Sequence, residues 1–496
     1  MASEYHAAPD GSPAGDGSEE APWDLWTAIS ASAIVEPGDT LWLHGGEYLP
    51  ATTQAGLPGP VACRSTLAGT AEAPIVIRAV PRERVAIDGR LISEAGTVGY
   101  TILEISGGHT WWWGLEIRDS TESRWSDIPG SDSGPRGHGV YSIQPGTKLI
   151  NCAIHDTGTG VFESGATGAE LYGNLVYHTG WNAPDRPHGP GFYIRNTFDP
   201  NERKLLRDNV VMLTGRHGWQ AYGTAGVSGN YFSVEGNVWI RNGEMFGQWV
   251  RGIQIVPAST VVDTEIIENY SWFSPGFGNH RVEAGSTGLT VRNNRFAGEL
   301  SLQLREPLVD ATITGNRFYS GTQIDAGEGF ADVALPGNEY GPGEGSEVFV
   351  RRNSYDPERF LVVIFNWEHA PEASVDLSEY PVRSGDVLRV ASVENLYGEE
   401  RIFRYLDPLR LPLTGWGVAA PAGMAALPSS LPEFGVFVMR LDKARLDDPG
   451  EGQGDRSQRQ VARLLAWQRP ELQVERKRER EKRESDWQAT IPAGVA

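Results

Sequence analysis

Side chains that could transfer a proton or bind an anion gather between residues 181 and 222. Asp185 and His188 lie close together, and Tyr193 and Arg195 follow directly after them. An imidazole or a phenol can transfer a proton, and a guanidinium can neutralise a carboxylate. Such a set could remove the proton next to a uronate carboxylate. We predict that Asp185 orients His188, and the candidate catalytic residues are His188, Tyr193, Arg195, Asp185, His217 and Glu283.

A series of short segments alternates apolar and polar residues, from Val140 through Phe192 and Trp219 to Leu302. This period of two indicates strands, and stacked strands would bring their outward side chains within about 4.8 Å of one another. Aromatic faces and amides in such a row suit a saccharide. The alternative is an ordinary solvent-facing surface. The candidate substrate-binding residues are Tyr141, Phe162, Trp181, Arg186, Gln220, Tyr222, Gln254 and Arg281.

Four histidines precede these strands at matching positions, which predicts several imidazoles along one rim: His138, His188, His217 and His280. A competing chemistry is hydrolysis or glycosyl transfer by two carboxylates. Spacing selects no pair among the candidates Asp156, Glu163, Asp185, Glu244 and Glu283. An alternative of another class is a glycan-binding surface protein without catalysis.

An asparagine repeat indicates the elements that must position these residues. Strand-like segments centre on asparagines that are separated by 22 to 35 residues, namely Asn151, Asn174, Asn209, Asn237, Asn269, Asn294 and Asn316. Asparagine tolerates left-handed backbone angles, and its amide can hydrogen-bond along a stack of amides. A period of this length is typical of a solenoid, with the longer steps carrying inserted loops.

From about residue 35 to 345 the chain resembles the right-handed parallel β-helix superfamily, the pectate-lyase-like fold. The asparagine repeats and the opening segments Tyr5–Ser12 and Pro37–Tyr48 carry this resemblance. It implies an all-β solenoid that acts on a polysaccharide in a groove along the coils. A polysaccharide lyase is the leading hypothesis, before a glycoside hydrolase or transferase. Asp185-Arg186-Pro187-His188 also resembles the Asp-Pro-His-Asp of mannuronan epimerases, although Arg186 is inserted and the final Asp is absent.

We predict three regions. Residues 1–345 form the β-helix, with an N-terminal helical cap around Trp23–Ser30. Residues 346–446, with strand patterns at sandwich-like spacing, form a small antiparallel β-sandwich. Residues 447–496 are dense in Arg, Lys and Glu and form a charged tail, helical or disordered.

The composition and net charge of the chain limit the classes of molecule that it could bind. A net charge of −21 over 496 residues argues against general nucleic-acid binding. The two cysteines show no zinc spacing, and no apolar run is long enough to span a membrane. We expect no cofactor; calcium is left open without a motif for it. The partner is a polysaccharide or oligosaccharide, and the oligomeric state is left open. No signal peptide is visible, yet we expect a secreted or cell-surface protein, with the cytoplasm as the alternative.

Overall fold

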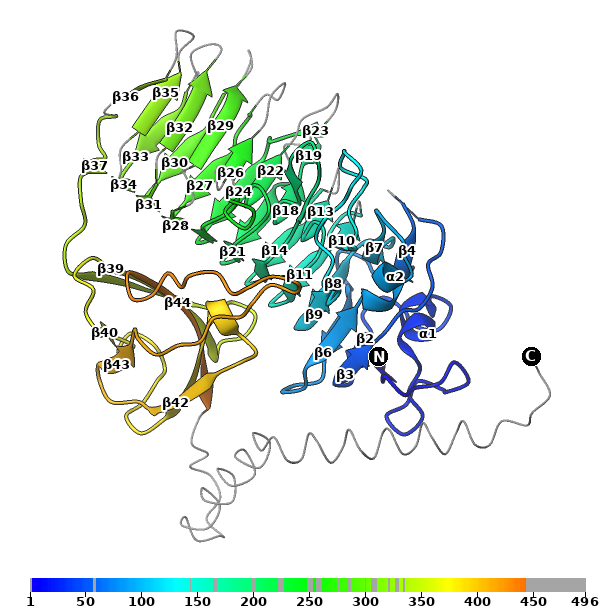
Figure 1. Ribbon diagram of the computed structural model, residues 1–496. Coiled ribbons are helices and arrows are strands. Elements are labelled where there is room, and N and C mark those ends of the chain that lie inside the picture. Colours follow the sequence, from blue (N-terminus) through cyan, green and yellow to red (C-terminus); the bar gives the residue numbers. More distant parts are fainter. Residues whose placement is uncertain are drawn as a thin grey trace. The chain divides into compact units, whose positions relative to one another are not determined.

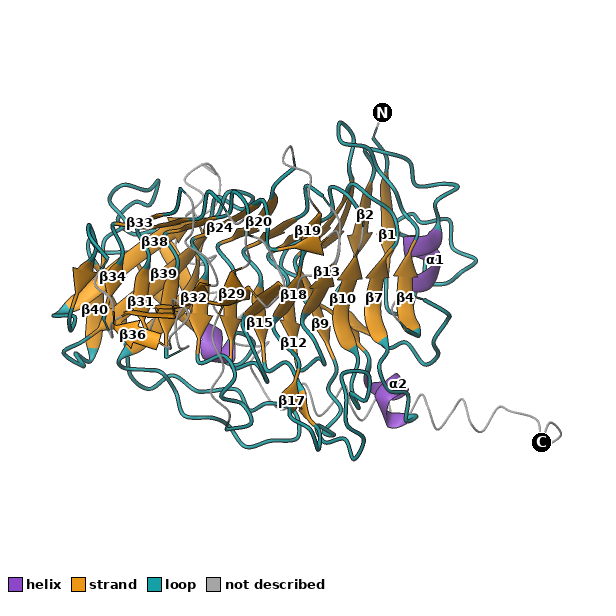
Figure 2. Cartoon of the chain, turned by 90° about the horizontal axis from the view of Figure 1, so that it is seen from above, coloured by secondary structure: helices purple, strands orange, loops and turns teal. Residues whose placement is uncertain are grey.

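The computed structural model describes residues 2–56, 59–142, 144–163, 167–197, 202–221, 227–247, 253–255, 261–273, 277–282, 287–298, 300–304, 310–319, 322–325, 330–332 and 335–442. Within these residues the chain winds through three long sheets, named A, B and C below, with strands from successive coils side by side (Figures 1 and 2). The predicted tail, residues 447–496, lies outside the described part.

Sheet A has eleven described strands, all parallel. In spatial order they are β1 (Glu4–Ala7), β2 (Thr40–Leu43), β5 (Ile75–Ala79), β8 (Thr110–Trp113), β11 (Lys148–Ile150), β14 (Glu170–Tyr172), β20 (Lys204–Arg207), β24 (Phe232–Glu235), β27 (Glu265–Ile267), β30 (Thr290–Arg292) and β33 (Thr312–Thr314).

Sheet B follows the same order of coils. Its described strands are β3 (Gly46–Tyr48), β6 (Val85–Asp88), β9 (Leu115–Arg118), β12 (Ala153–His155), β15 (Leu175–Tyr177), β21 (Val210–Met212), β25 (Val238–Ile240), β28 (Tyr270–Trp272), β31 (Arg295–Ala297), β34 (Arg317–Phe318) and β37 (Glu339–Tyr340).

Sheet C forms the third side, and only its last described strand runs antiparallel. Its strands are β4 (Val61–Ser65), β7 (Thr101–Ile105), β10 (His138–Ser142), β13 (Val161–Glu163), β18 (Phe192–Ile194), β22 (Trp219–Ala221), β26 (Ile253–Ile255), β29 (Phe277–Val282), β32 (Leu300–Leu304), β35 (Thr322–Asp325) and β36 (Phe330–Asp332). The predicted right-handed parallel β-helix is therefore confirmed.

The alternation of each strand turns its apolar residues into the solenoid. On sheet C the residues Val140, Val161, Phe192 and Trp219 are buried in one continuous core. Their neighbours Tyr141, Phe162, Tyr193 and Gln220 are paired strand to strand on the outer face. One column of side chains therefore crosses the coils, as the sequence pattern predicted.

The predicted asparagine ladder is present, but it starts one coil later. Buried amides are hydrogen-bonded from Asn174 to Asn338, each Nδ2 donating to the next Oδ1 at 2.8–3.0 Å. Asn151 is not a rung: the N–H of its neighbour Cys152 donates to Asn174 Oδ1, and the Asn151 amide bonds Asn353. The left-handed angle falls on the residue before each ladder asparagine, as at Gly173 (φ 65°).

Two short helices, α1 (Leu25–Ser30) and α2 (Arg90–Glu94), lie in the N-terminal part. Asp24 caps α1 by accepting the Thr27 N–H, and Leu25, Ala28 and Ile29 are buried. The predicted helix is therefore present, while its service as a cap over the solenoid stays a prediction.

A second sheet follows the solenoid. It is antiparallel, in the order β38 (Ser346–Arg352), β39 (Arg359–Asn366), β44 (Phe434–Asp442), β41 (Val387–Ser392) and β42 (Glu400–Arg404). The short helix η1 (Val393–Asn395) follows β41, and β40 (Glu372–Val375) pairs with β43 (Leu409–Pro412). An apolar layer from Phe360, Val375 and Leu411 joins the two sheets, as in a small sandwich.

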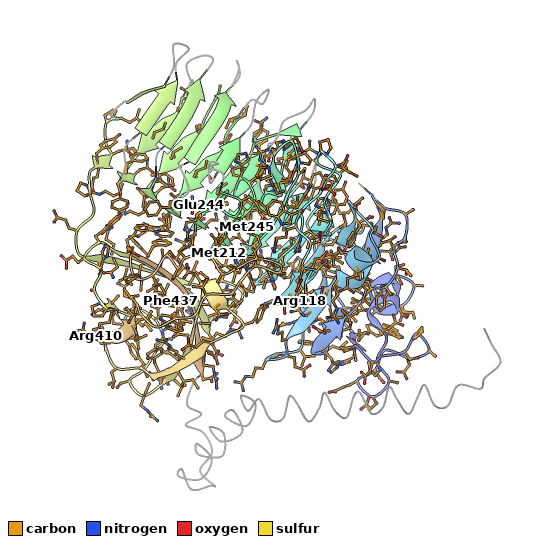
Figure 3. The ribbon with its side chains drawn as sticks, in the orientation of Figure 1. Arg118, Met212, Glu244, Met245, Arg410 and Phe437 are labelled. Carbon is orange, nitrogen blue, oxygen red and sulfur yellow. The ribbon has the colours of Figure 1, made fainter. Side chains whose placement is uncertain are left out.

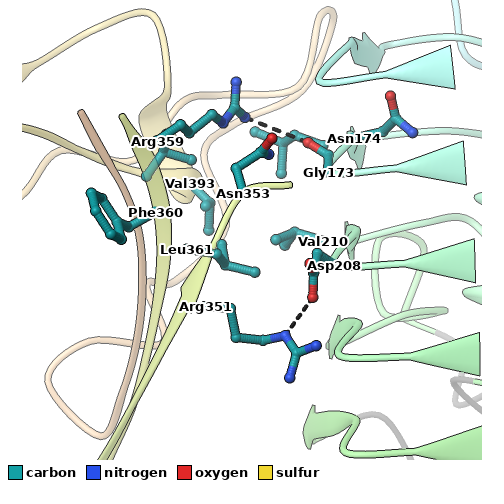
Figure 4. Close-up of a pocket in the computed structure, with 12 residues that line it drawn as sticks. Gly173, Asn174, Asp208, Val210, Arg351, Asn353, Arg359, Phe360, Leu361 and Val393 are labelled. Atoms are coloured by element: carbon teal, nitrogen blue, oxygen red, sulfur yellow. Dashed lines mark hydrogen bonds and ion pairs between the residues drawn. The ribbon is translucent and has the colours of Figure 1, made fainter. Parts of the chain in front are cut away.

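The other face of this second sheet packs on sheet B. Met212 of the solenoid, which is labelled in Figure 3, and Tyr177 share an apolar cluster with Val363 and Phe434. Arg351 of β38 binds Asp208 and, at 3.0 Å, Glu268 (Figure 4). Burial alone would lower the pKa of Arg351, but the negative charges of Asp208 and Glu268 outweigh it and raise the pKa above its usual value. Residues Met1–Asp442 form one compact unit.

No helix in the described residues has the length and apolar character needed to cross a membrane.

The ladder generates the first prediction. Asn237→Ala removes the bond from Nδ2 to Leu206 O (2.7 Å) and leaves the Asn209 N–H and amide without their buried acceptor. Unsatisfied buried groups should lower the free energy of unfolding by about 2–4 kcal/mol in denaturant titration. The matched control is Asn338→Ala at the half-buried last rung, which should lose less because water can replace its bonds. Equal losses at the two positions would contradict the ladder's role.

Candidate functional site

A cleft with a volume of about 470 Å³ opens on the outer face of sheet C. Strands β10, β13, β18 and β22 form its floor. One wall is a hairpin of β16 (Trp181–Asn182) and β17 (Pro187–His188), and a second wall is the loop 119–137. Both walls are insertions between strands of the solenoid, where clefts on a rigid scaffold are usually built.

Stacked rings form the floor. The ring centroids of Tyr141 and Phe162 lie 5.3 Å apart, and those of Phe162 and Tyr193 lie 4.9 Å apart with an angle of 6° between the planes. Phe162 and Tyr193 line the cleft with Gln220. Because strand spacing sets these distances, the rings stack directly and offer a flat aromatic wall to a sugar ring.

The hairpin carries the imidazole of His188 into the cleft wall. Nε2 of His188 lies 3.3 Å from Asp185 Oδ1, and Nδ1 lies 3.3 Å from a guanidinium nitrogen of Arg186. These partners place the neutral-ring proton on Nε2 and a lone pair on Nδ1. Burial is the main cause that lowers the pKa of His188, and the positive charge of Arg186 adds to it. The imidazole is therefore neutral at physiological pH.

Asp185 is tied to both walls. Its Oδ1 also accepts the Gly130 N–H at 3.1 Å, and this bond is the main reason that its pKa falls to about 2. The backbone that follows the hairpin packs closely on the solenoid at Gly189. A Cβ there would lie only 2.1 Å from the Gly158 carbonyl oxygen, so the position accepts only glycine. The arrangement holds His188 from one side and aligns it with the loop wall.

Two buried arginines hold the loop wall on the solenoid. Arg124 and Arg136 are both 0% exposed. Arg124 donates to the carbonyls of His178 (3.0 Å) and Gly180 (3.1 Å), and Arg136 donates to that of Asp156, which directly follows β12. Since charged donors satisfy these carbonyls, the loop is a fixed part of the cleft.

A second histidine shares the wall. His138 packs against Trp181 at 6.0 Å, and its Nδ1 accepts the Thr159 N–H at 3.1 Å. The neutral ring therefore carries its proton on Nε2 and can donate but not accept in the cleft. Burial lowers the pKa of His138 to about 4.

The cleft is locally cationic in an acidic chain. Three of its lining residues are arginines, namely Arg186, Arg195 and Arg216, and one, Asp132, is a carboxylate. Arg195 lies 5.5 Å from the Tyr193 ring centroid. The pKa of Arg216 is lowered by burial and by the charge of Arg186, and its buried Nε has no hydrogen-bond partner among the described residues. An anion would relieve this concentration of charge.

The structure brings together most of the candidate site. Asp185 contacts His188, and the cleft is lined by His188, Tyr193, Arg195, Phe162, Arg186 and Gln220. His217 is buried beside Arg216 and does not line the cleft. Tyr141 is not among the lining residues either, but its ring stacks on the lining ring of Phe162. Gln254 and Arg281 lie in strands β26 and β29 of sheet C, whose side chains are not described there. Tyr222 and Glu283 lie outside the described residues.

Trp181 corrects one expectation. We expected its ring to stack on a sugar; Trp181 does line the cleft, but only 1% of it is exposed, which leaves little of the ring for such a contact. The antiparallel pairing with His188 stacks the two rings at 5.0 Å and 11°, and His138 approaches the indole from another strand. Trp181 therefore packs between the imidazoles of His188 and His138 and supports both.

Sequence reasoning missed the loop wall. Asp132 lines the cleft, and Arg124 and Arg136 fix the loop that carries it, yet the loop has no repeat or periodic pattern that would have pointed to the cleft. Of the alternative carboxylates, Asp156 is paired with Arg124 and His155, and Glu244 with Arg241 at 2.8 Å. Both are outside the cleft lining. The Glu163 side chain is not among those described.

No metal centre is formed by the part of the chain that the structure describes: no group of three His, Cys, Asp or Glu side chains gathers there.

Comparison with known proteins finds similarity at the level of structure. No family model and no curated protein sequence matches the chain. A pectate lyase is 17% identical, with a TM-score of 0.43, over 64% of this chain and 78% of that one. A rhamnogalacturonan lyase is 13% identical (TM-score 0.43; 63% and 87%), and a lacto-N-biosidase from Eubacterium ramulus is 14% identical (0.41; 69% and 68%). Similarities this distant leave the reaction to be argued from the cleft.

The buried imidazoles generate the second prediction. The folded-state pKa of His138 lies near 4, below the usual 6.5. Between these two pH values the unfolded chain binds a proton at this histidine and the folded chain does not. Stability should therefore fall as the pH drops from 6.5 towards 4. In His138→Gln the slope of unfolding free energy over this window should decrease by about 1.4 kcal/mol per pH unit, the value for one proton.

The control is the exposed His369, replaced by Asn because its φ is 55°. Denaturant titrations across the pH range should give His369→Asn the slope of the unchanged protein. A His138→Gln slope that equals that of the parent would show that His138 is not held neutral.

Proposed function

We propose that the chain is a polysaccharide lyase that cleaves an acidic, uronate-containing chain in the cleft on sheet C. The observation that carries the proposal is the grouping of Arg186, Arg195 and Arg216 around His188 and Tyr193. Guanidiniums are the side chains best suited to bind a carboxylate, and a bound carboxylate makes the adjacent C–H more acidic. The stacked rings of the floor would hold the sugar units.

The reaction assigns one role to each group. Arg195 and Arg216 bind the carboxylate, and the lone pair of His188 Nδ1 takes the proton from carbon 5. The electron pair of that C–H bond forms the double bond between carbons 4 and 5, and the bond from carbon 4 to the glycosidic oxygen breaks. The Tyr193 hydroxyl gives that oxygen its proton. Arg186, which faces Nδ1 at 3.3 Å, moves onto the substrate and uncovers the base.

The same geometry disfavours hydrolysis by two carboxylates. That chemistry needs a carboxylic acid whose pKa is raised so that it can donate a proton. Asp185, next to the cleft, has a pKa near 2 because the Gly130 N–H and His188 stabilise its charge. It would remain ionised through the working range, which leaves Asp132 alone among the lining carboxylates whose side chains the structure describes.

The decisive experiment measures absorbance at about 235 nm, where the unsaturated product of elimination absorbs. The substrates are a panel of acidic and neutral polysaccharides. His188→Gln and Tyr193→Phe should each lower turnover about a hundredfold or more on an acidic polymer. His109→Asn, in a turn before sheet A with φ 51°, is the control that should retain full activity.

The product decides between the alternatives. New reducing ends without absorbance would replace the lyase by a hydrolase, and binding without turnover would replace it by a glycan-binding protein. Full activity in both cleft variants would remove the assigned roles.

The Asp185 contact generates a prediction on pH. The carboxylate raises the pKa of His188 against the larger effect of burial. Asp185→Asn removes that negative charge and should shift the acid limb of the kcat/KM profile to lower pH, because the neutral base then persists further into acid. Asp127→Asn, exposed in the same loop, should leave the limb in place. A shift to higher pH would contradict the assignment of His188 as base.

A further inference from the structure

A larger cavity, of about 610 Å³, lies at another place on the solenoid. It is enclosed by the turns that join sheets A and B and by strands β41, β42 and β44 of the second sheet. Neither the floor nor the walls of the cleft on sheet C contribute to it. Its size is in the range of sites for small organic ligands and exceeds what a single inorganic anion needs.

Three arginines stand side by side on one wall of this cavity. Arg440 of β44 is directly opposite both Arg359 of β39 and Arg389 of β41, and all three line the cavity. Opposite residues of antiparallel strands point to the same face, and like charges in such positions are destabilising. The row therefore concentrates positive charge on one face of the sheet, with Arg440 exposed and Arg359 buried beside it.

Only one arginine of the row is paired with carboxylates of the protein in the described structure. Arg389 binds Asp442 at 2.6 Å and Glu400 at 2.9 Å. Arg359 and Arg440 form no ion pair with any described residue. Arg359 is only 9% exposed, and the one hydrogen bond of its guanidinium in the described structure is a long one, 3.5 Å to the Gly173 carbonyl (Figure 4). Burial, helped by the charge of Arg440, lowers the pKa of Arg359 to about 10.

The opposite wall presents another fixed cation. The guanidinium of Arg78 lies between two indoles, 4.9 Å from the Trp42 ring centroid and 4.2 Å from that of Trp113. Register explains the sandwich, since these residues are partners on β2, β5 and β8. The buried Nε of Arg78 has no partner in the described structure.

The carboxylates of the lining do not neutralise these cations. Glu83 accepts the Gly45 N–H at 2.6 Å, and Glu358 has a contact of its own. Asp356 favours the charged forms of Arg78 and Arg359 only from beyond ion-pair distance. Tyr397, which is 40% exposed, also lines the cavity and has the Arg84 guanidinium 3.9 Å from its ring centroid. Cations and a partly exposed aromatic ring are the chemistry that recognises an acidic sugar.

We propose that this cavity is a second saccharide-binding site, which takes a carboxylate-bearing sugar unit between Arg78, Arg359 and Arg440 with its ring against Tyr397. The choice of a uronate rests on the proposed function. The site holds a distant part of the same acidic chain and performs no chemistry.

The test is isothermal titration calorimetry on the full chain in an Arg216→Gln background, so that binding in the cleft is weakened. The probes are a galacturonate hexamer, a mannuronate hexamer, a neutral glucose hexamer and sodium sulfate. At least one acidic hexamer should bind one to one and the neutral hexamer should not. Arg440→Gln should weaken the acidic hexamer about tenfold or more, the loss of one hydrogen bond to a charged group.

The matched control is Arg410→Gln on β43, a 64% exposed side chain at 3.7 Å from Glu372 (Figure 3). It should bind as the Arg216→Gln parent does. Tyr397→Ala should weaken the hexamer and leave sulfate binding unchanged, which separates a sugar from a free anion. An equal effect of Arg410→Gln, or none of Tyr397→Ala, would overturn the proposal, as would the absence of binding by both acidic hexamers.

Melting temperature without ligand gives an independent readout. Because Arg440→Gln removes a like charge from the row, the variant should melt at or above the parent temperature. A decrease of several degrees would make Arg440 a structural residue and overturn the proposal. A failure of the proposed function can be told apart from a failure of this second site. If the cleft assignment is wrong, Arg216→Gln retains full turnover, whatever Arg440→Gln does to binding.

Discussion

The structure depends on the stacking of successive coils in one register, and the buried asparagine ladder enforces that register. Through its side-chain donor and acceptor, each rung from Asn174 onward satisfies a backbone carbonyl and a backbone N–H of the preceding coil, as Asn174 does for Leu149 and Cys152, and the rungs bond one another in turn. A slip by one residue would leave buried amides without partners and would turn the apolar faces outward. The inserted loops can therefore vary in length while the strands stay aligned.

Fixed register is also what assembles the cleft. Phe162, Tyr193 and Gln220 are far apart along the chain, yet they are consecutive partners on sheet C. The column places rings and an amide at the spacing of strands, which no single segment of the chain could do. The hairpin with His188 and the loop with Asp132 then add walls that the repeat itself does not encode.

The limits of sequence reasoning follow from the same division. Repeat and alternation predicted the solenoid and the outward column, and proximity in the sequence predicted the contact of Asp185 with His188, because each depends on local pattern; the hairpin that carries these two residues was not predicted. Asn151 was wrong as a rung because its pattern matches the others while its amide turns to Asn353 of the second sheet. The burial of Trp181 and the wall held by Arg124 and Arg136 are long-range packing, which spacing does not reveal.

Charge shows where the solenoid departs from its own rule. Elsewhere, cations meet carboxylates on the neighbouring strand, as Arg64 meets Glu104 at 2.9 Å, Lys148 meets Glu170 at 2.9 Å and Arg317 meets Glu339 at 3.2 Å. Each pair joins register partners on adjacent coils. The cleft gathers arginines around one carboxylate, and the wall of the second sheet repeats arginine across three strands. In a chain of net charge −21, such departures carry an electrostatic cost that an anionic ligand would offset, and local conflicts of this kind are expected at functional sites.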